Sequence, residues 1–296
     1  MRAFFRHWLR SGIPAALFLG AVLATVVAYV RSVAAPVITV CTIACIVFAF
    51  VLGYSVRMGR EWPRLHGLRR GEYSQVWDQL GTSASAAANA ATGISHEDSL
   101  RASGRSVAER IARFVSLEPG DDVLEIGCGV GRVGWAIAPL CRSWTGCDIS
   151  RQMLKYAQQR LAAFDNVHFV QLSGAQLAGV PDHSIDVVYC TNMLPHLDEM
   201  ERWQYAREAY RVLRHGGRIY LDSIALDSPE GWAMLTNNLE QRRYGTEPPY
   251  MPLPSTGEEL GAYCKQAGFD GLRIDVLKSL LIVTGTKATA ASTRES

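Results

Sequence analysis

A run of glycines, Gly127-Cys128-Gly129-Val130-Gly131, directly follows a short apolar segment, Val123–Ile126. The apolar segment predicts a buried strand, and the residues after the glycines predict a helix. Glycines at such a junction let the backbone pass close to a ligand, because they carry no side chain. The helix N-terminus beyond them offers N–H groups to a carboxylate or a phosphate. The sequence therefore predicts a small-molecule site at the end of this strand.

A nicotinamide cofactor is one interpretation of these glycines. Gly129–Gly134 matches the pattern G-x-G-x-x-G, but that pattern should begin directly at the strand end. Here it begins two residues later, and counting from Gly127 puts Arg132 where the third glycine belongs. The nicotinamide interpretation is weakened and stays open as an alternative.

The elements around the glycines alternate between predicted helix and predicted strand from Ser99 onward, which favours a parallel sheet covered on both faces. Ser106–Ser116 predicts one of these helices. Before Ser99, apolar residues recur at helical spacing from Leu65 to Leu80, whereas the Ala- and Ser-rich stretch Gly81–Gly93 suggests a mobile segment. We therefore expect the cofactor pocket to be built wholly from residues after Ser99.

Five segments together resemble the class I methyltransferases that use S-adenosylmethionine (AdoMet). Val123–Arg132 resembles the first motif of that family, and Trp144–Ser150 resembles the end of its second strand. Ser184–Cys190 resembles the fourth strand of the family, and Tyr210–Arg218 resembles the entry to its fifth strand. Ala267–Phe269 resembles the turn before its last two strands. The resemblance implies a Rossmann-like seven-stranded α/β sheet over residues 99–286.

The resemblance also implies which residues contact AdoMet. In the family the glycine turn contacts the methionine part, and an acidic residue takes both ribose hydroxyls. Asp148 suits the second role, since a carboxylate can accept two hydrogen bonds at once. The implied cofactor residues are Glu125, Gly127, Cys128, Gly129, Gly131, Arg132, Asp148, Ile149, Ser173, Gly174, Ala175 and Thr191.

Two departures from the family narrow the function. The family usually has Asp after the third strand, where this sequence has Ser173-Gly174-Ala175, so adenine recognition would depend on the Ser173 hydroxyl and backbone amides. The Asn-Pro-Pro-aromatic motif of many DNA and amide methyltransferases is absent. The 30 basic and 28 acidic residues nearly cancel, and the domain has no concentrated basic patch. We therefore expect no nucleic-acid partner.

Methyl transfer needs a base only when the acceptor must lose a proton. His196, just past the fourth strand, is the candidate general base, although a capping or packing histidine is the alternative. Asp222 at the end of the fifth strand is a weaker candidate, and Asp186 inside its strand is interpreted as structural. The long connection Ile224–Pro254 is rich in aromatic residues and proline, which is typical of a lid or acceptor loop or of residues packed over the sheet. The odd number of cysteines, without paired metal-type spacing, fits reduced thiols and no metal.

Two charge-free runs, Ser11–Val30 and Ser32–Val56, precede the domain. Each approaches or exceeds the roughly 20 residues that cross a bilayer. They predict a transmembrane hairpin over residues 1–56, with spans at about 12–30 and 34–56. Buried core helices, or a cleaved signal peptide followed by one span, are the alternatives. Because arginines flank the hairpin and only Arg31 lies between the runs, both termini are expected in the cytoplasm.

The whole sequence thus predicts a membrane-anchored AdoMet-dependent methyltransferase, with residues 57–98 a basic juxtamembrane segment and linker helix and 287–296 a disordered tail. Its expected partners are the lipid bilayer and a small-molecule or lipid-linked acceptor. A soluble acceptor, a catalytically silent AdoMet-binding module of a membrane complex, and a nicotinamide-dependent oxidoreductase are the alternatives. The sequence identifies neither the acceptor nor the oligomeric state.

Overall fold

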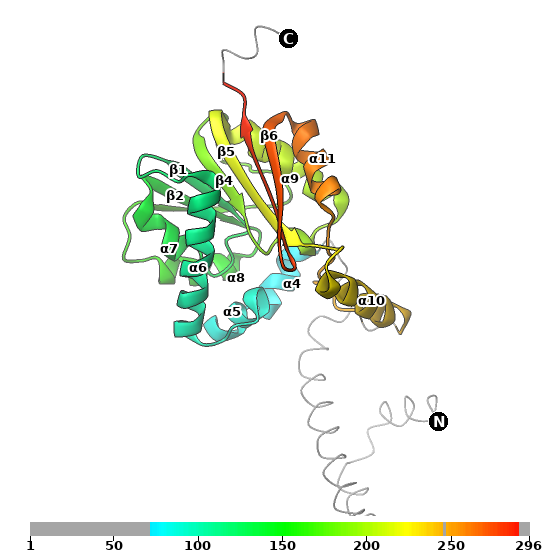
Figure 1. The fold of residues 1–296 in the computed structure, drawn as a ribbon. Coiled ribbons are helices and arrows are strands. Elements are labelled where there is room, and N and C mark those ends of the chain that lie inside the picture. Colours follow the sequence, from blue (N-terminus) through cyan, green and yellow to red (C-terminus); the bar gives the residue numbers. More distant parts are fainter. Residues whose placement is uncertain (1–71, 245–246, 290–296) are drawn as a thin grey trace, which may run out of the picture. The chain divides into compact units, whose positions relative to one another are not determined.

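A seven-stranded sheet, ordered β3-β2-β1-β4-β5-β7-β6, forms the centre of the computed structural model, which describes residues 72–244 and 247–289 (Figure 1). Strands β1 to β5 pair in parallel, whereas β7 pairs antiparallel with β5 and with β6. The sheet is therefore mixed and not parallel throughout, because a tight turn joins β6 to β7 where a parallel pair would need a crossover. The strands are β1 (Asp122–Ile126), β2 (Ser143–Asp148), β3 (Val167–Gln171), β4 (Ile185–Cys190), β5 (Leu213–Ile224), β6 (Phe269–Leu277) and β7 (Leu280–Lys287).

Helices cover both faces of the sheet, as the alternation of elements predicted. The core of one face includes residues of α6, α7 and α8, and the core of the other includes residues of α9 and α11. The helices are α4 (Tyr73–Leu80), α5 (Ala84–Thr92), α6 (Glu97–Val115), α7 (Gly134–Ile137), α8 (Arg151–Arg160), α9 (Glu199–Val212), α10 (Pro229–Arg243) and α11 (Gly257–Ala267), with short 3₁₀ turns η1 (Ala138–Leu140) and η2 (Leu194–His196).

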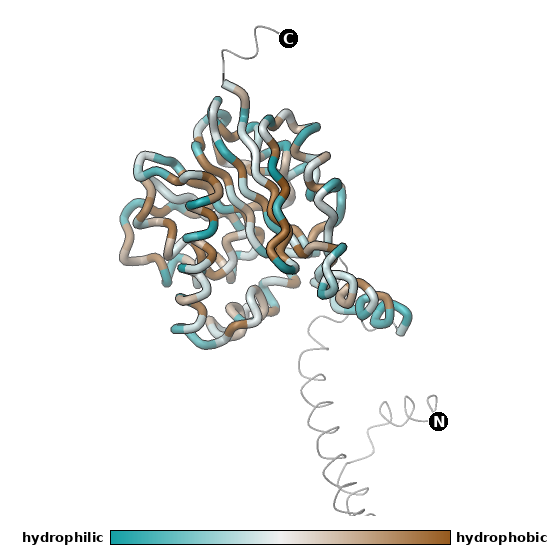
Figure 2. Tube along the Cα trace, viewed as in Figure 1, coloured by the Kyte–Doolittle hydropathy of each residue, from teal (hydrophilic) through white to brown (hydrophobic). Residues whose placement is uncertain are grey.

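The central strands are held by burial on both faces. Strands β1 and β4 are buried along almost their whole length, as strands inside a doubly covered sheet should be. Figure 2 shows hydrophobic residues concentrated along the strands. Trp144, Tyr189 and Tyr220 are the largest fully buried side chains, and they fix the sheet beneath the cavity described below.

The segment before Ser99 departs from prediction. The stretch Gly81–Gly93, expected to be mobile, contains helix α5, which Ser83 caps by accepting a hydrogen bond from the Ala86 amide. The helix predicted over Ser106–Ser116 begins earlier, at Glu97. Helix α4 is joined to the sheet domain through Asp78, whose Oδ1 accepts from the Ser150 hydroxyl at 2.6 Å. The many alanines and serines of this stretch suggested a linker. They form a helix instead, and a run of such small side chains does not indicate which surface the helix packs against.

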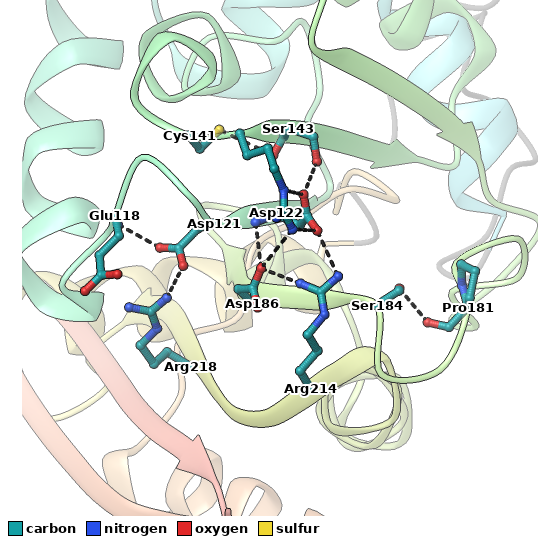
Figure 3. Close-up of polar contacts among 11 residues, drawn as sticks. Glu118, Asp121, Asp122, Cys141, Ser143, Pro181, Ser184, Asp186, Arg214 and Arg218 are labelled. Atoms are coloured by element: carbon teal, nitrogen blue, oxygen red, sulfur yellow. Dashed lines mark hydrogen bonds and ion pairs between the residues drawn. The ribbon is translucent and has the colours of Figure 1, made fainter.

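A cluster of ion pairs lies at the amino ends of β1 and β4 (Figure 3). The Asp122 carboxylate pairs with Arg142 and Arg214 and accepts from the Ser143 hydroxyl at 2.7 Å. Asp186 accepts from the Asp122 amide at 2.8 Å and pairs with Arg214. This supports the structural interpretation of Asp186, which ties two neighbouring strands together.

Several predictions lie outside the described residues. They are the two spans at about 12–30 and 34–56, the basic segment 57–71 and the tail from 290 onward. Lys287, which the prediction assigned to the tail, is instead the buried last residue of β7. Among the helices of the described ranges, none combines the length and the apolar character that crossing a membrane requires.

Candidate functional site

A cavity opens at the carboxyl ends of β1, β2 and β4. Ligands of open α/β sheets bind at this edge, where the strand order reverses. His196 and all predicted cofactor residues except Gly131 line the cavity. The predicted cofactor residues found there are Glu125, Gly127, Cys128, Gly129, Arg132, Asp148, Ile149, Ser173, Gly174, Ala175 and Thr191.

The glycine turn after β1 needs glycine for two different reasons. Gly127 has φ +71°, and a Cβ there would lie 2.5 Å from Met193 Cγ. A side chain at this position would therefore both strain the backbone and collide with the cavity wall. Gly131 has φ +75°, but its Cβ would lie 2.5 Å from Leu161 Cδ1. Gly131 thus allows the turn to pack near α8, and its prediction as a cavity residue is not met.

Asp148 ends β2 and is almost fully buried. Its Oδ2 accepts from the Gly129 amide at 2.8 Å, and its Oδ1 accepts from the Ser150 amide at 2.8 Å. Burial raises the pKa of this carboxyl to about 6. Each carboxylate oxygen has a second lone pair, so the group can still accept hydrogen bonds from a ligand's hydroxyls.

Glu125 lies beneath the glycine turn within a buried polar chain. Tyr189 donates its hydroxyl to Glu125 Oε2 at 2.6 Å, and Trp144 Nε1 donates to the Tyr189 oxygen at 2.9 Å. Burial raises the pKa of Glu125 to about 8. Arg132, whose pKa burial lowers, lines the same part of the cavity and donates to the Ser103 hydroxyl at 3.0 Å. Glu125 and Arg132 therefore give this end of the cavity a buried carboxyl group and a guanidinium group.

The wall after β3 consists of small residues, Ser173, Gly174 and Ala175. The Tyr205 hydroxyl of α9 donates to the Gly174 carbonyl at 3.3 Å, which fixes the course of this segment. Backbone atoms and one hydroxyl are thus the polar groups that Ser173–Ala175 can present to a ligand.

His196, the predicted base, is positioned by two contacts. Its Nδ1 lies 2.6 Å from the Tyr250 carbonyl, to which it donates because a carbonyl oxygen only accepts. The Trp77 ring meets the imidazole edge-on, with the centroids 5.0 Å apart. Tyr250 lies in the long connection between β5 and α11, so this connection takes part in forming the site, as its length suggested.

Asp222, the weaker candidate for a base, does not line the cavity. It is buried, and it accepts from the Thr191 hydroxyl at 2.6 Å and from the Asn192 amide at 2.8 Å. Burial raises its pKa, while Arg110 lies 3.7 Å away. Asp222 therefore positions the segment after β4. The prediction that Asp222 acts as a base is wrong, because its carboxylate is buried and does not line the cavity.

Helices α4 and α5 form a wall that the sequence analysis missed. Tyr73, Trp77, Ala91 and Thr92 line the cavity, so the expectation of a pocket built wholly after Ser99 is wrong. The Tyr73 hydroxyl donates to Glu201 Oε2 at 2.8 Å. The helical spacing of Tyr73 and Trp77 predicted an amphipathic helix, but nothing in that spacing says which surface the helix covers.

Comparisons with known proteins show that part of the chain is similar to methyltransferases. Residues 123–217 match the family model described as a methyltransferase domain. The 27-O-demethylrifamycin SV methyltransferase of Amycolatopsis mediterranei is 35% identical over 129 residues, which cover 42% of this chain and 47% of that enzyme. The ubiquinone biosynthesis O-methyltransferase of Pseudomonas fluorescens is 31% identical over 106 residues, covering 36% and 45%. The chain thus spans about half the length of the curated relatives it matches.

The fold also has relatives among solved structures. A chain from the complex of the Haloferax volcanii Trm112 methyltransferase activator with its methyltransferase superposes with a TM-score of 0.52 at 17% identity, covering 68% of this chain and 96% of that chain. At this identity the likeness shows the fold alone. The described residues thus have the fold of that methyltransferase, and residues 123–217 within it match the methyltransferase domain model.

Proposed function

We propose that this chain transfers a methyl group from AdoMet to a hydroxyl of an apolar small-molecule or lipid-linked acceptor, while anchored in a membrane. The observation that carries the proposal is that His196 lines the same cavity as the glycine turn and Asp148. A cofactor pocket and a candidate base in one cavity suit methyl transfer to a group that must lose a proton.

The residues present are suited to hold AdoMet. The turn at Gly127 and Gly129 has positive φ, and beside Gly129 a Cβ would lie 3.8 Å from its nearest neighbour, which leaves room for a ligand against the backbone. Asp148 keeps lone pairs for two ribose hydroxyls, and the segment Ser173–Ala175 offers backbone groups to the adenine. When bound, AdoMet supplies an electrophilic methyl group on a sulfonium, which needs no activation of the leaving group.

His196 removes the proton from the acceptor. Because Nδ1 donates to the Tyr250 carbonyl, the neutral ring carries its lone pair on Nε2. With AdoMet bound as the methyl donor, Nε2 would accept the hydroxyl proton as the acceptor oxygen takes the methyl group. General bases of this kind contribute about 10²- to 10⁴-fold in rate.

The acceptor side of the cavity is mostly apolar. Tyr73 and Trp77 of α4 line it together with Met193, Leu197 and Tyr205. Flat aromatic walls suit a ring or an unsaturated chain better than a highly charged acceptor. The names of both relatives, a 27-O-demethylrifamycin SV methyltransferase and a ubiquinone biosynthesis O-methyltransferase, support oxygen as the methylated atom.

The membrane attachment is proposed from the sequence. Two charge-free runs, Ser11–Val30 and Ser32–Val56, are flanked by arginines on both outer sides. That bias places the hairpin ends, and with them the methyltransferase domain, in the cytoplasm. An anchor also raises the local concentration of enzyme at the bilayer, which suits a lipid-phase acceptor.

The test is incubation of the detergent-solubilised full chain with methyl-labelled AdoMet and either a lipid extract or a soluble extract. An O-methylated product from the lipid extract is expected, and it should be lost in His196→Gln but retained in His168→Gln, which changes an exposed histidine outside the cavity. Label only in the soluble extract would make the hairpin a mere tether. AdoMet binding without any labelled product would contradict the proposal that the chain is a methyltransferase. Binding of NAD in place of AdoMet would contradict the proposal that AdoMet is the cofactor.

A further inference from the structure

Helix α10 departs at several positions from the usual burial pattern of a surface helix. Its buried residues are Gly231 and Asn238, whereas Trp232 and Leu239 are 59% and 64% exposed. A helix on a globular protein normally turns its apolar side to the core and its polar side to water. Two large apolar side chains of α10, Trp232 and Leu239, are therefore left without cover in the described part of the chain.

The exposed apolar residues fall on one stripe. Trp232, Thr236, Leu239 and Arg243 follow one another at spacings of three or four, which places them on one side of a helix. Arg242 flanks the stripe, and Glu230 lies on the other side of the helix. Figure 1 shows α10 extending away from the sheet. We call these four residues, with Arg242, the outer stripe.

The inner side of α10 is attached close to the candidate base. A Cβ at Gly231 would lie 1.9 Å from the Ala225 carbonyl oxygen, so the helix starts in direct contact with the backbone after β5. Asn238 donates from Nδ2 to the Pro252 carbonyl at 2.6 Å. The neighbouring Tyr250 carbonyl accepts from His196. Helix α10 is thus connected through residues 250–252 to the wall that holds the base.

We infer that the outer stripe docks on the surface of an anionic bilayer and brings the acceptor side of the cavity to the lipid phase. The inference rests on the proposed membrane attachment. Residues 57–71 separate the end of the second charge-free run from the described chain, and fifteen residues span at most about 50 Å. The domain is therefore confined near the bilayer.

The composition of the stripe suits this occupant better than a second protein copy. Tryptophan is enriched at membrane interfaces, where its ring sits at the level of the headgroups. Arg243 and Arg242 are 72% and 62% exposed, and Arg242 also lies 3.6 Å from the Glu247 carboxylate. Both can place their aliphatic stems along the apolar side and exchange these exposed carboxylates for anionic headgroups. Glu240, which lies 3.9 Å from Arg243, is exposed at the edge of the stripe and can stay in water.

The test uses the full chain reconstituted in mixed phosphatidylcholine–phosphatidylglycerol vesicles that contain brominated acyl chains. The emission of wild type minus that of Trp232→Phe isolates Trp232. This difference spectrum is expected to be blue-shifted and quenched by the brominated lipid. The difference between wild type and Trp135→Phe is the control, because Trp135 lies on α7 under the guanidinium groups of Arg101 and Arg105, and it should be unquenched.

A matched pair of variants tests the stripe as a surface. Leu239→Asp should abolish the quenching of Trp232, whereas Asn237→Asp, which adds the same charge on another side of α10, should leave it. Trp232 emission that is unquenched, or blue-shifted only at high protein concentration as a second copy would cause, overturns the inference. Sedimentation with vesicles after an alkaline wash reports the anchor separately, and AdoMet binding reports the cofactor site, so a failure of either is distinguishable from a failure of docking.

Discussion

Acidic side chains gather at both ends of the central sheet, and the two groups are held in opposite ways. At the carboxyl ends, burial raises the pKa of Glu125 and of Asp148, and Asp148 is held by backbone amides. At the amino ends, hydrogen bonds from Arg142 and Arg214 hold the pKa of Asp122 below its ordinary range. The same residue types are thus desolvated at one edge and paired with cations at the other.

The difference separates function from stability within one fold. A desolvated carboxylate is costly in the folded protein and becomes favourable only when a ligand donates to it, so perturbed groups of this kind are typical of binding sites. A carboxylate paired with arginine stabilises the folded chain without any ligand. We therefore expect changes at the carboxyl edge to affect binding and rate, and changes at the amino edge to affect the free energy of unfolding.

The largest effect is expected at His196. His196→Gln removes the base and should lower kcat by about 10²- to 10⁴-fold, because general base catalysis contributes that much. AdoMet affinity should be unchanged, since the imidazole bonds to the Tyr250 carbonyl and contacts Trp77, not the glycine turn. Single-turnover rates together with calorimetry separate the two quantities. A variant with normal kcat and a lowered Tm would make His196 a packing residue.

The second effect is expected at Asp148. Asp148→Ala removes two ribose hydrogen bonds to a charged group and leaves the Gly129 and Ser150 amides without their present acceptor. Such losses cost roughly 1.5–3 kcal/mol, or about ten- to a hundredfold in affinity. Calorimetry on the folded variant measures this, with Asp165→Ala as an exposed control outside the cavity. Unchanged AdoMet binding by Asp148→Ala would refute the assignment.

The sequence was sufficient to predict which residues at the ends of β1 and β2 come together in one cavity. Gly127, Gly129 and Asp148 lie close to strand ends, and a parallel sheet brings such positions to one edge whatever the rest of the chain does. Local spacing therefore predicted long-range proximity. Gly131 shows the limit of this kind of prediction. The sequence indicated a turn with positive φ at Gly131, but not that Gly131 would pack toward Leu161 and away from the cavity.

The acceptor half could not be predicted in the same way. Trp77 and Tyr73 reach the cavity because α4 packs on the domain through Asp78 and Ser150, a contact between residues 72 positions apart. Tyr250 reaches His196 through a loop whose course no periodicity encodes. Asp222 looked like a candidate base by its place at the end of the fifth strand, and only tertiary structure shows that it is buried and accepts from Thr191 and Asn192.

The third effect sharpens the comparison through pH. Because burial raises the pKa of Asp148 to about 6, the ligand-free protein keeps this carboxyl protonated below that pH. Ribose hydroxyls donate to the ionised form, so AdoMet affinity should fall as pH drops below about 6, by at most about tenfold per pH unit for one proton. For the same reason this group's contribution to the stability of the ligand-free protein is lost as pH rises through about 6. In Asp148→Asn, neither the pH dependence of AdoMet affinity nor that of stability should contain a contribution from this residue. If the variant shows the same pH dependence as wild type, another group is responsible for it.

The smallest effect is expected at the amino edge, where Asp122→Asn removes a charge that pairs with Arg142 and Arg214. Their side chains are 58% and 36% exposed, so solvent screens both pairs and the loss should be about 1 kcal/mol in the free energy of unfolding. Since the pKa of Asp122 is lowered in the folded protein, its contribution is present above its ordinary value near 3.8 and is lost as pH falls toward the lowered value.

Urea unfolding at neutral and at acidic pH checks this, and the difference between wild type and Asp122→Asn should shrink in acid. Asp182→Asn is the matched control, because Asp182 pairs with Arg211 but is 63% exposed, and it should change stability by only a few tenths of a kcal/mol. AdoMet affinity should be the same in all three proteins at neutral pH, since neither carboxylate lines the cavity. A fall in affinity for Asp122→Asn would mean that the two edges of the sheet are coupled, and the separation of function from stability would not hold.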